Sequence, residues 1–125
     1  MKAECKALDK KYSKFLAKEK YIEGQRSAAA AFERLTTKAP IVAEQVKTIY
    51  ETIDHLEAAR AALLTEMLND FDLVADARLH SILMMRYVEG LRWREIANKM
   101  QYAEDYVMQL RTEALKKIVK AKSSK

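Results

Sequence analysis

Hydrophobic residues in the first part of the chain recur every three or four positions, which is the spacing of one side of a helix. The series runs through Cys5, Leu8, Tyr12, Phe15, Ile22 and Ala29, with the charged Glu19 and Arg26 in the slots between. It predicts a long helix that packs along one line. A break is expected at "LTTKAP", where Pro40 disfavours helical geometry at Ala39 and can begin the next helix.

A second series of the same spacing follows this break. It consists of Val46, Ile49, Ile53, Leu56, Arg60, Leu63 and Met67. Two long helices joined by a short loop predict an antiparallel helical hairpin over residues 1–72. Its outer faces keep apolar residues that we expect a second copy to cover in a homodimer, namely Phe32, Leu35, Tyr50 and Leu64.

The hairpin is expected to loosen at "LNDFD", residues 68–72, because Asn and Asp favour helix caps over helix interiors. Either Asp72 or Asp76 can then cap a third helix that runs through "ARLHSILMMRYVEG". Gly90 stands where a helix commonly ends, in the left-handed conformation that glycine adopts at little cost.

The stretch "RWREIANKMQYAEDYVMQLRTEALKKI", residues 92–118, has the pattern of two short-linked helices that cross steeply. Such a helix-turn-helix needs a small residue where the helices touch, and Ala97 supplies it. Gln101 occupies the tight turn, where glycine is usual, and Ala103 occupies the cap. Apolar residues fall at the expected core positions Ile96, Met100, Tyr102, Val107 and Leu110. A continuous amphipathic helix is the alternative, although it would favour large apolar residues near 101 and 103–104.

These residues carry a resemblance to region 4 of bacterial sigma factors. There an "RYxxG" helix end precedes "xxEIA", and the recognition helix ends in an "xALxKL"-like run, as in "LMMRYVEGLRWREIA" and "EALKKI" here. With the long hairpin before it, the chain is similar to a family of small phage-encoded sigma-region-4-like proteins, which regulate late transcription. The resemblance implies an all-α fold, with the hairpin followed by a three-helix helix-turn-helix domain over residues 73–125.

The resemblance also implies which residues contact DNA. The positions that face bases are Glu104, Asp105, Met108, Gln109, Thr112 and Glu113. Glu and Asp accept hydrogen bonds from cytosine, and Gln109 can pair with adenine. The positions that contact phosphates are Arg92, Arg94, Lys99, Arg111, Lys116 and Lys117, with "KAKSSK" as a basic tail. Trp93 is expected to pack in the small core, with the DNA backbone as the alternative, and Tyr106 either contacts phosphate or is an ordinary surface residue.

The charge distribution agrees with a polyanionic partner. Residues 86–125 carry ten Lys or Arg against five Asp or Glu, and residues 1–22 carry seven against three. Residues 23–85 are acidic, with six against ten. A basic segment on a helical motif is typical of nucleic-acid binding, although an ordinary solvated surface is the simpler alternative.

The amino-acid composition and the lack of catalytic motifs limit the fold class and the kinds of function to be expected. Two Gly and one Pro in 125 residues, among strong helix formers, predict a nearly all-α protein. There is no nucleophile–base pair, phosphate loop or metal motif, so we expect neither an enzyme nor a cofactor. His55 and His80 follow Glu51 and Asp76 by one helical turn and are interpreted as structural. The single Cys5 cannot form an internal disulfide and fits a reducing cytosol.

The sequence lacks an apolar run that could span a bilayer, and its first residues do not resemble a signal peptide, so we expect a cytoplasmic protein without a membrane partner.

The leading hypothesis is a transcription regulator that binds double-stranded DNA. Two alternatives stay open. One is an adaptor that binds RNA polymerase without reading DNA, and the other is a DNA-packaging component similar to a small terminase subunit.

Overall fold

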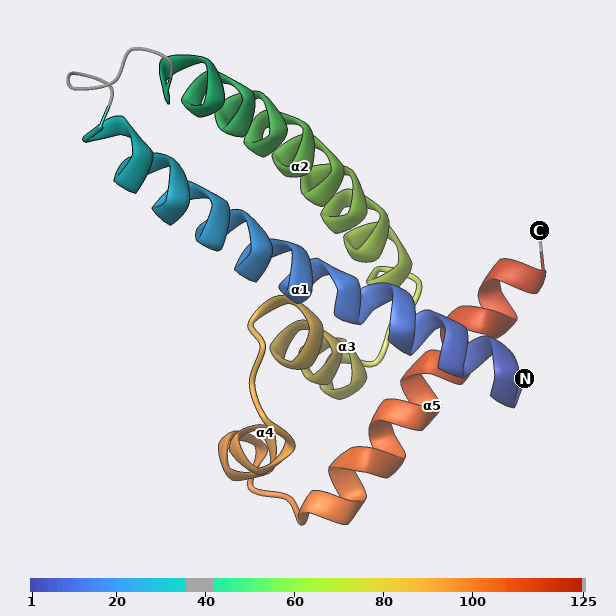
Figure 1. Ribbon diagram of the computed structural model, residues 1–125. Helices are drawn as coiled ribbons and strands as arrows, with labels where there is room; N and C mark the ends of the chain where they lie inside the picture. Colours follow the sequence, from blue (N-terminus) through green and yellow to red (C-terminus); the bar gives the residue numbers. More distant parts are fainter. Residues whose placement is uncertain (36–41, 125) are drawn as a thin grey trace. The chain divides into compact units, whose positions relative to one another are not determined.

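The computed structural model describes residues 1–35 and 42–124, and this part of the chain is helical without any strand (Figure 1). Strong helix formers fill its elements, so the all-α prediction is confirmed. The predicted break at Thr36, Thr37 and Pro40 lies outside the described residues. The elements in chain order are α1 (Lys2–Glu33), α2 (Val42–Phe71), α3 (Ala77–Leu83), the π-helical turn η1 (Met84–Val88), α4 (Trp93–Met100) and α5 (Glu104–Ser123).

The chain packs as two compact units. One consists of Met1–Leu16 together with Leu64–Lys125, and the other of Ala17–Leu63. Helices α1 and α2 each contribute to both units. This division by packing differs from the predicted segments 1–72 and 73–125, which stay a prediction about function.

The unit of residues 17–63 has a narrow apolar core between its two helical segments. Ile22, Ala29 and Ile53 are buried there, and Ile49 and Leu56 pack against them half-buried. All five belong to the two hydrophobic series of the sequence. This core stabilises its unit only modestly because few side chains are buried in it. Each buried Ile contributes about 1.5–3 kcal/mol, and the conformational entropy lost on folding offsets part of that gain.

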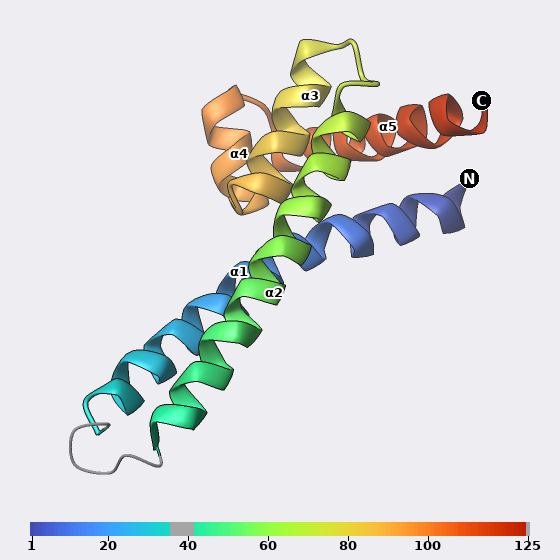
Figure 2. The same ribbon diagram turned by 90° about the horizontal axis from the view of Figure 1, so that it is seen from above.

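The three charged members of the two series, Glu19, Arg26 and Arg60, all form ion pairs inside this unit. Arg60 Nη1 lies 3.2 Å from Glu19 Oε1, and Arg26 forms an ion pair with Glu57. The earlier residue of α1 pairs with the later residue of α2, so the two segments run in opposite directions, as Figures 1 and 2 show. Charged residues are therefore tolerated at these positions because they stay partly or fully exposed and each finds an opposite charge across the unit.

The unit formed by residues 1–16 and 64–125 has an aromatic centre. Tyr12, Phe71 and Tyr87 are almost fully buried. The Tyr12 ring meets the rings of Phe71 and Tyr87 edge to face, with centroids 5.1 Å and 5.4 Å apart. Such geometry is favourable for aromatic pairs beyond the area that they bury. The largest aliphatic side chains buried in the same unit are Met67, Leu79, Ile82, Leu83, Ile96, Leu115 and Ile118.

Helix α2 ends within residues 68–72, where the sequence predicts a joint, although Asn69 and Asp70 still belong to the helix. Helix α2 continues through Phe71, and Asp70 is only 5% exposed. Its Oδ2 accepts a 2.7 Å hydrogen bond from the Tyr12 hydroxyl and lies 2.9 Å from Lys122 Nζ. The helix persists because Met67 and Phe71 are buried and because the Asp70 carboxylate is satisfied by tertiary partners.

Helix α3 begins as the sequence indicates, but it ends at Leu83 and continues as the π-helical turn η1, where the sequence predicts one helix up to Gly90. Asp76, rather than Asp72, is its cap, and its Oδ1 accepts a 2.9 Å hydrogen bond from the Arg78 backbone N–H. After η1 the chain reverses at Gly90, whose φ of 74° confirms the predicted left-handed conformation. A Cβ at Gly90 would also lie 3.3 Å from Leu16 Cδ1, so both backbone geometry and space favour glycine here.

Candidate nucleic-acid interface

Helices α4 and α5 are joined by a turn of three residues. At its start Gln101 adopts φ 59° and ψ 42°, so the left-handed position expected for glycine is held by glutamine. The Tyr102 N–H donates a 3.0 Å hydrogen bond to the Ala97 carbonyl, which closes the end of α4. A left-handed conformation costs a residue with a Cβ about 1–2 kcal/mol. The strain at Gln101 is therefore maintained by the packing on either side of it.

That packing uses the residues that the sequence pattern singles out. Ile96 and Ala97 on α4 are buried, as are Val107 and Leu110 on α5. Met100 and Tyr102 are half-buried. Figures 1 and 2 show α4 and α5 crossing steeply. The small side chain of Ala97 lies at 4% exposure on the inner side of α4, which is where a steep crossing requires a small residue.

Helix α5 begins without a side-chain cap. Ala103 is extended, and its side chain makes no capping hydrogen bond. Glu104 and Asp105 occupy the first turn, where their negative charges interact favourably with the positive end of the helix dipole. The acidic residues therefore help the helix to begin, whatever else they contact.

Most of the predicted base-facing residues lie on the outer side of α5. Glu104, Asp105, Met108, Gln109 and Glu113 are exposed. Thr112 differs, because it is half-buried and its hydroxyl donates a 3.2 Å hydrogen bond to the Met108 carbonyl. The outer side of α5 thus presents carboxylates, an amide and a thioether to a partner.

The predicted phosphate contacts fall into two groups. Five are exposed, and in the described residues none of their charged groups forms an ion pair; they are Arg92, Arg94, Lys99, Lys116 and Lys117. Arg111 is half-buried, and its Nη1 lies 3.3 Å from Asp9 Oδ1. Asp9 also accepts a hydrogen bond from the Tyr87 hydroxyl. Burial and the hydrogen bond to Asp9 raise the pKa of Tyr87 above its ordinary value.

Two guanidinium groups lie over the ring of Trp93. Arg86 Cζ is 4.6 Å from the indole centroid, and Arg111 Cζ is 5.5 Å from it. Arg86 Nη1 also donates a 3.1 Å hydrogen bond to the Leu91 carbonyl, which fixes the loop before α4. Trp93 itself is half-buried. Sequence reasoning did not single out Arg86, because the stacking depends on the reversal at Gly90 and not on a local spacing.

A second group of side chains surrounds the start of α5. The rings of Tyr102 and Tyr106 meet edge to face with centroids 5.1 Å apart. Arg78 Nη1 lies 3.4 Å from the Tyr106 hydroxyl, and Arg78 Nη2 lies 3.1 Å from Asp76 Oδ2. Hydrogen bonds from the side chain and backbone of Arg78 lower the pKa of Asp76. Arg78 is a further exposed cation beside α5 that the sequence motif does not contain.

In the described part of the chain, the two histidines and the cysteine form no metal site. His80 Nε2 lies 3.6 Å from Asp72 Oδ1, and Asp76 pairs with Arg78 instead. His55 is exposed and Cys5 is buried. Within residues 1–35 and 42–124, no three His, Cys, Asp or Glu side chains are placed to hold a metal ion.

Over the same residues, no helix combines the length and the apolar composition that crossing a bilayer requires.

The chain was compared with protein-family models, with curated proteins and with solved structures, and none of the three comparisons found a match.

Proposed function

We propose that the protein is a transcription regulator that binds double-stranded DNA by placing α5 in the major groove. One observation carries this proposal. The turn at left-handed Gln101 joins two steeply crossing helices whose inner residues, such as Ala97 and Val107, are buried. This arrangement leaves the outer side of α5 free along its first turns, as a recognition helix of a helix-turn-helix requires.

The exposed cations support the same assignment. Arg92 immediately precedes α4, Arg94 lies in its first turn and Lys99 in its last turn, and Lys116 and Lys117 lie in the second half of α5. Cations on both helices of the motif suit contacts to phosphates on either side of a groove. These contacts fix the position of a protein on DNA and make its affinity strongly dependent on salt.

The composition of the outer side of α5 suggests what it reads. Glu104 and Asp105 offer acceptors for the exocyclic amine of cytosine, and Gln109 can form a bidentate pair with adenine. Arginines, which commonly hold guanine edges, are lacking among these exposed positions, which are Glu104, Asp105, Met108, Gln109 and Glu113. We infer that the preferred site presents cytosine and adenine to α5.

The unit of residues 17–63 suits a role in assembly. Phe32, Leu35 and Tyr50 are exposed large apolar side chains near the end of α1 and along α2. Covering them in a homodimer would remove apolar surface from water and place two DNA-binding motifs on one particle. Sedimentation equilibrium of the purified chain distinguishes a dimer from the many-copy ring expected of a small terminase-like component.

An adaptor that binds RNA polymerase is the second candidate, and one observation favours it. Glu104 and Asp105 are exposed at the end of α5 that would enter the groove, where phosphates repel carboxylates. An acidic helix end suits a basic protein surface. Selection of bound sequences from random duplex DNA, with and without polymerase, tests both functions. Enrichment without polymerase supports direct DNA binding, and enrichment only with polymerase supports the adaptor.

A further inference from the structure

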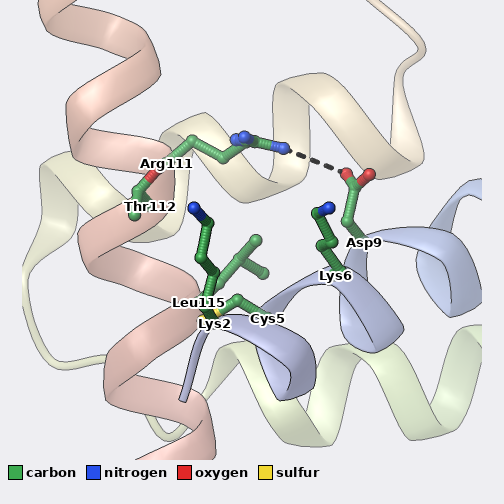
Figure 3. A pocket seen from close by; sticks show the side chains of 7 residues that line it. All are labelled: Lys2, Cys5, Lys6, Asp9, Arg111, Thr112 and Leu115. Carbon is green, nitrogen blue, oxygen red and sulfur yellow. Dashed lines mark hydrogen bonds and ion pairs between the residues drawn. The ribbon is translucent and has the colours of Figure 1, made fainter.

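A pocket of about 300 Å³ lies between the first turns of α1 and the middle of α5 (Figure 3). Both segments belong to the unit formed by residues 1–16 and 64–125. The pocket is lined by Lys2, Cys5, Lys6, Asp9, Arg111, Thr112 and Leu115. Its volume exceeds what a single water molecule requires, so it can admit a small ligand group.

The charges around this α1–α5 pocket are predominantly positive. Figure 3 shows the side chains of Lys2 and Lys6 extending toward Arg111. Neither lysine forms an ion pair with any residue that the structure describes. Asp9 supplies the one carboxylate of the lining, and its Oδ1 already accepts from Tyr87 and lies against Arg111. The pocket therefore holds three cations against one carboxylate that is already engaged.

One hydrogen-bond donor at the pocket also lacks an acceptor. The Nε of Arg111 is buried, and no hydrogen-bond acceptor for it exists among the described residues. A buried donor without a partner costs about 1–3 kcal/mol. An anion in the α1–α5 pocket would reduce the electrostatic part of this cost and would pair the two free ammonium groups. Cys5 and Leu115 add an apolar wall that suits carbon atoms attached to that anion.

The pocket adjoins the side of α5 that the proposed function assigns to base reading. Thr112 lines the pocket and lies one helical turn beyond Met108, to whose carbonyl its hydroxyl donates. Gln109 precedes Thr112 by three residues on the same helix. A phosphate in the pocket would thus lie at the edge of a groove whose bases face Met108 and Gln109.

We propose that the α1–α5 pocket binds one phosphate of the DNA backbone, with the attached deoxyribose against Cys5 and Leu115. This inference rests on the proposed function and adds α1 to the DNA-binding surface. It also gives a role to Lys2 and Lys6, two of the seven lysines in residues 1–22, which the helix-turn-helix does not explain. Lys2 and Lys6 are the phosphate ligands, and Asp9 holds Arg111 in place beside them.

The test measures how the affinity for duplex DNA depends on salt. The double variant Lys2→Ala/Lys6→Ala is compared with wild type and with Lys20→Ala/Lys47→Ala, which removes the same charge from exposed positions in the unit of residues 17–63. Losing one phosphate contact should make the slope of log K against log salt shallower by about 0.9. The control variant should keep the wild-type slope, and Lys2→Arg/Lys6→Arg should keep it as well.

Each outcome has one interpretation. If wild type binds duplex DNA and Lys2→Ala/Lys6→Ala has the same slope, the pocket assignment is wrong and the proposed function stands. Equal loss of slope in the control variant would also overturn the assignment, because net charge alone would explain it. If wild type binds no duplex DNA, the proposed function fails and the pocket assignment fails with it. Thermal unfolding of all four proteins verifies that they are folded.

Discussion

Arg111 on α5 forms an ion pair with Asp9 on α1, with Nη1 and Oδ1 3.3 Å apart, although 102 residues separate them in sequence. The same Asp9 oxygen accepts a hydrogen bond from Tyr87, whose side chain is almost fully buried. One carboxylate therefore connects the first turns of α1, the end of η1 and the middle of α5. The position of α5 depends on α1 as well as on α4.

Replacing Asp9 by Ala should lower the stability of the unit that contains it. Tyr87 would lose the acceptor of its hydroxyl, and Arg111 would lose its counter-charge. We expect the free energy of unfolding to fall by about 1–2 kcal/mol, since Asp9 is partly exposed and water replaces part of the interaction. Urea unfolding measures the change. Asp54→Ala, at an exposed position, should stay within about 0.5 kcal/mol of wild type; a similar loss in both variants would contradict the role of Asp9.

Two buried tyrosines should make the protein sensitive to alkali. Burial raises the pKa of Tyr12 and Tyr87, and hydrogen bonds to Asp70 and Asp9 raise it further. A raised folded-state pKa contributes stability that is complete below the unfolded-state value near 10 and is lost as pH rises above it. Stability should therefore decline above about pH 10. Unfolding in urea at a series of pH values tests this, and Tyr12→Phe should decline less steeply than wild type; a parallel decline would argue against Tyr12 as a cause.

The turn between α4 and α5 offers a substitution that should stabilise the protein. Glycine at position 101 removes the left-handed strain but loses more entropy on folding, so Gln101→Gly should gain up to about 1 kcal/mol. Gln101→Val should destabilise, because a β-branched side chain tolerates positive φ poorly. Thermal unfolding ranks the three proteins. Wild type more stable than both variants would show that Gln101 makes contacts that outweigh its strain.

Elements that depend on local chemistry were predictable from sequence. Asp76 caps α3 and Gly90 reverses the chain because each residue type suits its own backbone geometry. The turn at Gln101 was predicted from the apolar residues around it, although glutamine is not the residue expected at a left-handed position, where glycine is usual. In each case the evidence lies within one or two helical turns of the residue.

Features that depend on distant partners could not be read in the same way. Asp70 looks like a helix breaker in sequence, and it is stable in α2 only because Tyr12 and Lys122 reach it. Arg111 looks like a free surface cation, yet Asp9 holds it. The α1–α5 pocket likewise combines residues about 100 positions apart. No hydrophobic period specifies which turn of α1 meets which turn of α5.

Substitutions on the two helices of the motif should affect DNA binding in different ways. Arg94→Ala removes an exposed cation of α4 and should weaken binding to all duplexes alike, with a shallower salt slope. Gln109→Ala should instead change sequence preference, with a cost of about 1–3 kcal/mol confined to the adenine that it pairs. Binding of both variants to a panel of single-base mutants of a selected site separates the effects. Indistinguishable profiles would show that Gln109 does not read a base.

The central claim is that α5 binds the DNA groove while cations of α4 and α5 contact phosphates. It is tested most directly by fluorescence anisotropy of labelled duplex DNA titrated with the full chain, without polymerase, over a tenfold range of salt. With roughly three to five phosphate contacts in each copy, log K should fall by about 0.9 per contact over that range. A flat response to salt, or no binding at the lowest salt, would contradict the claim.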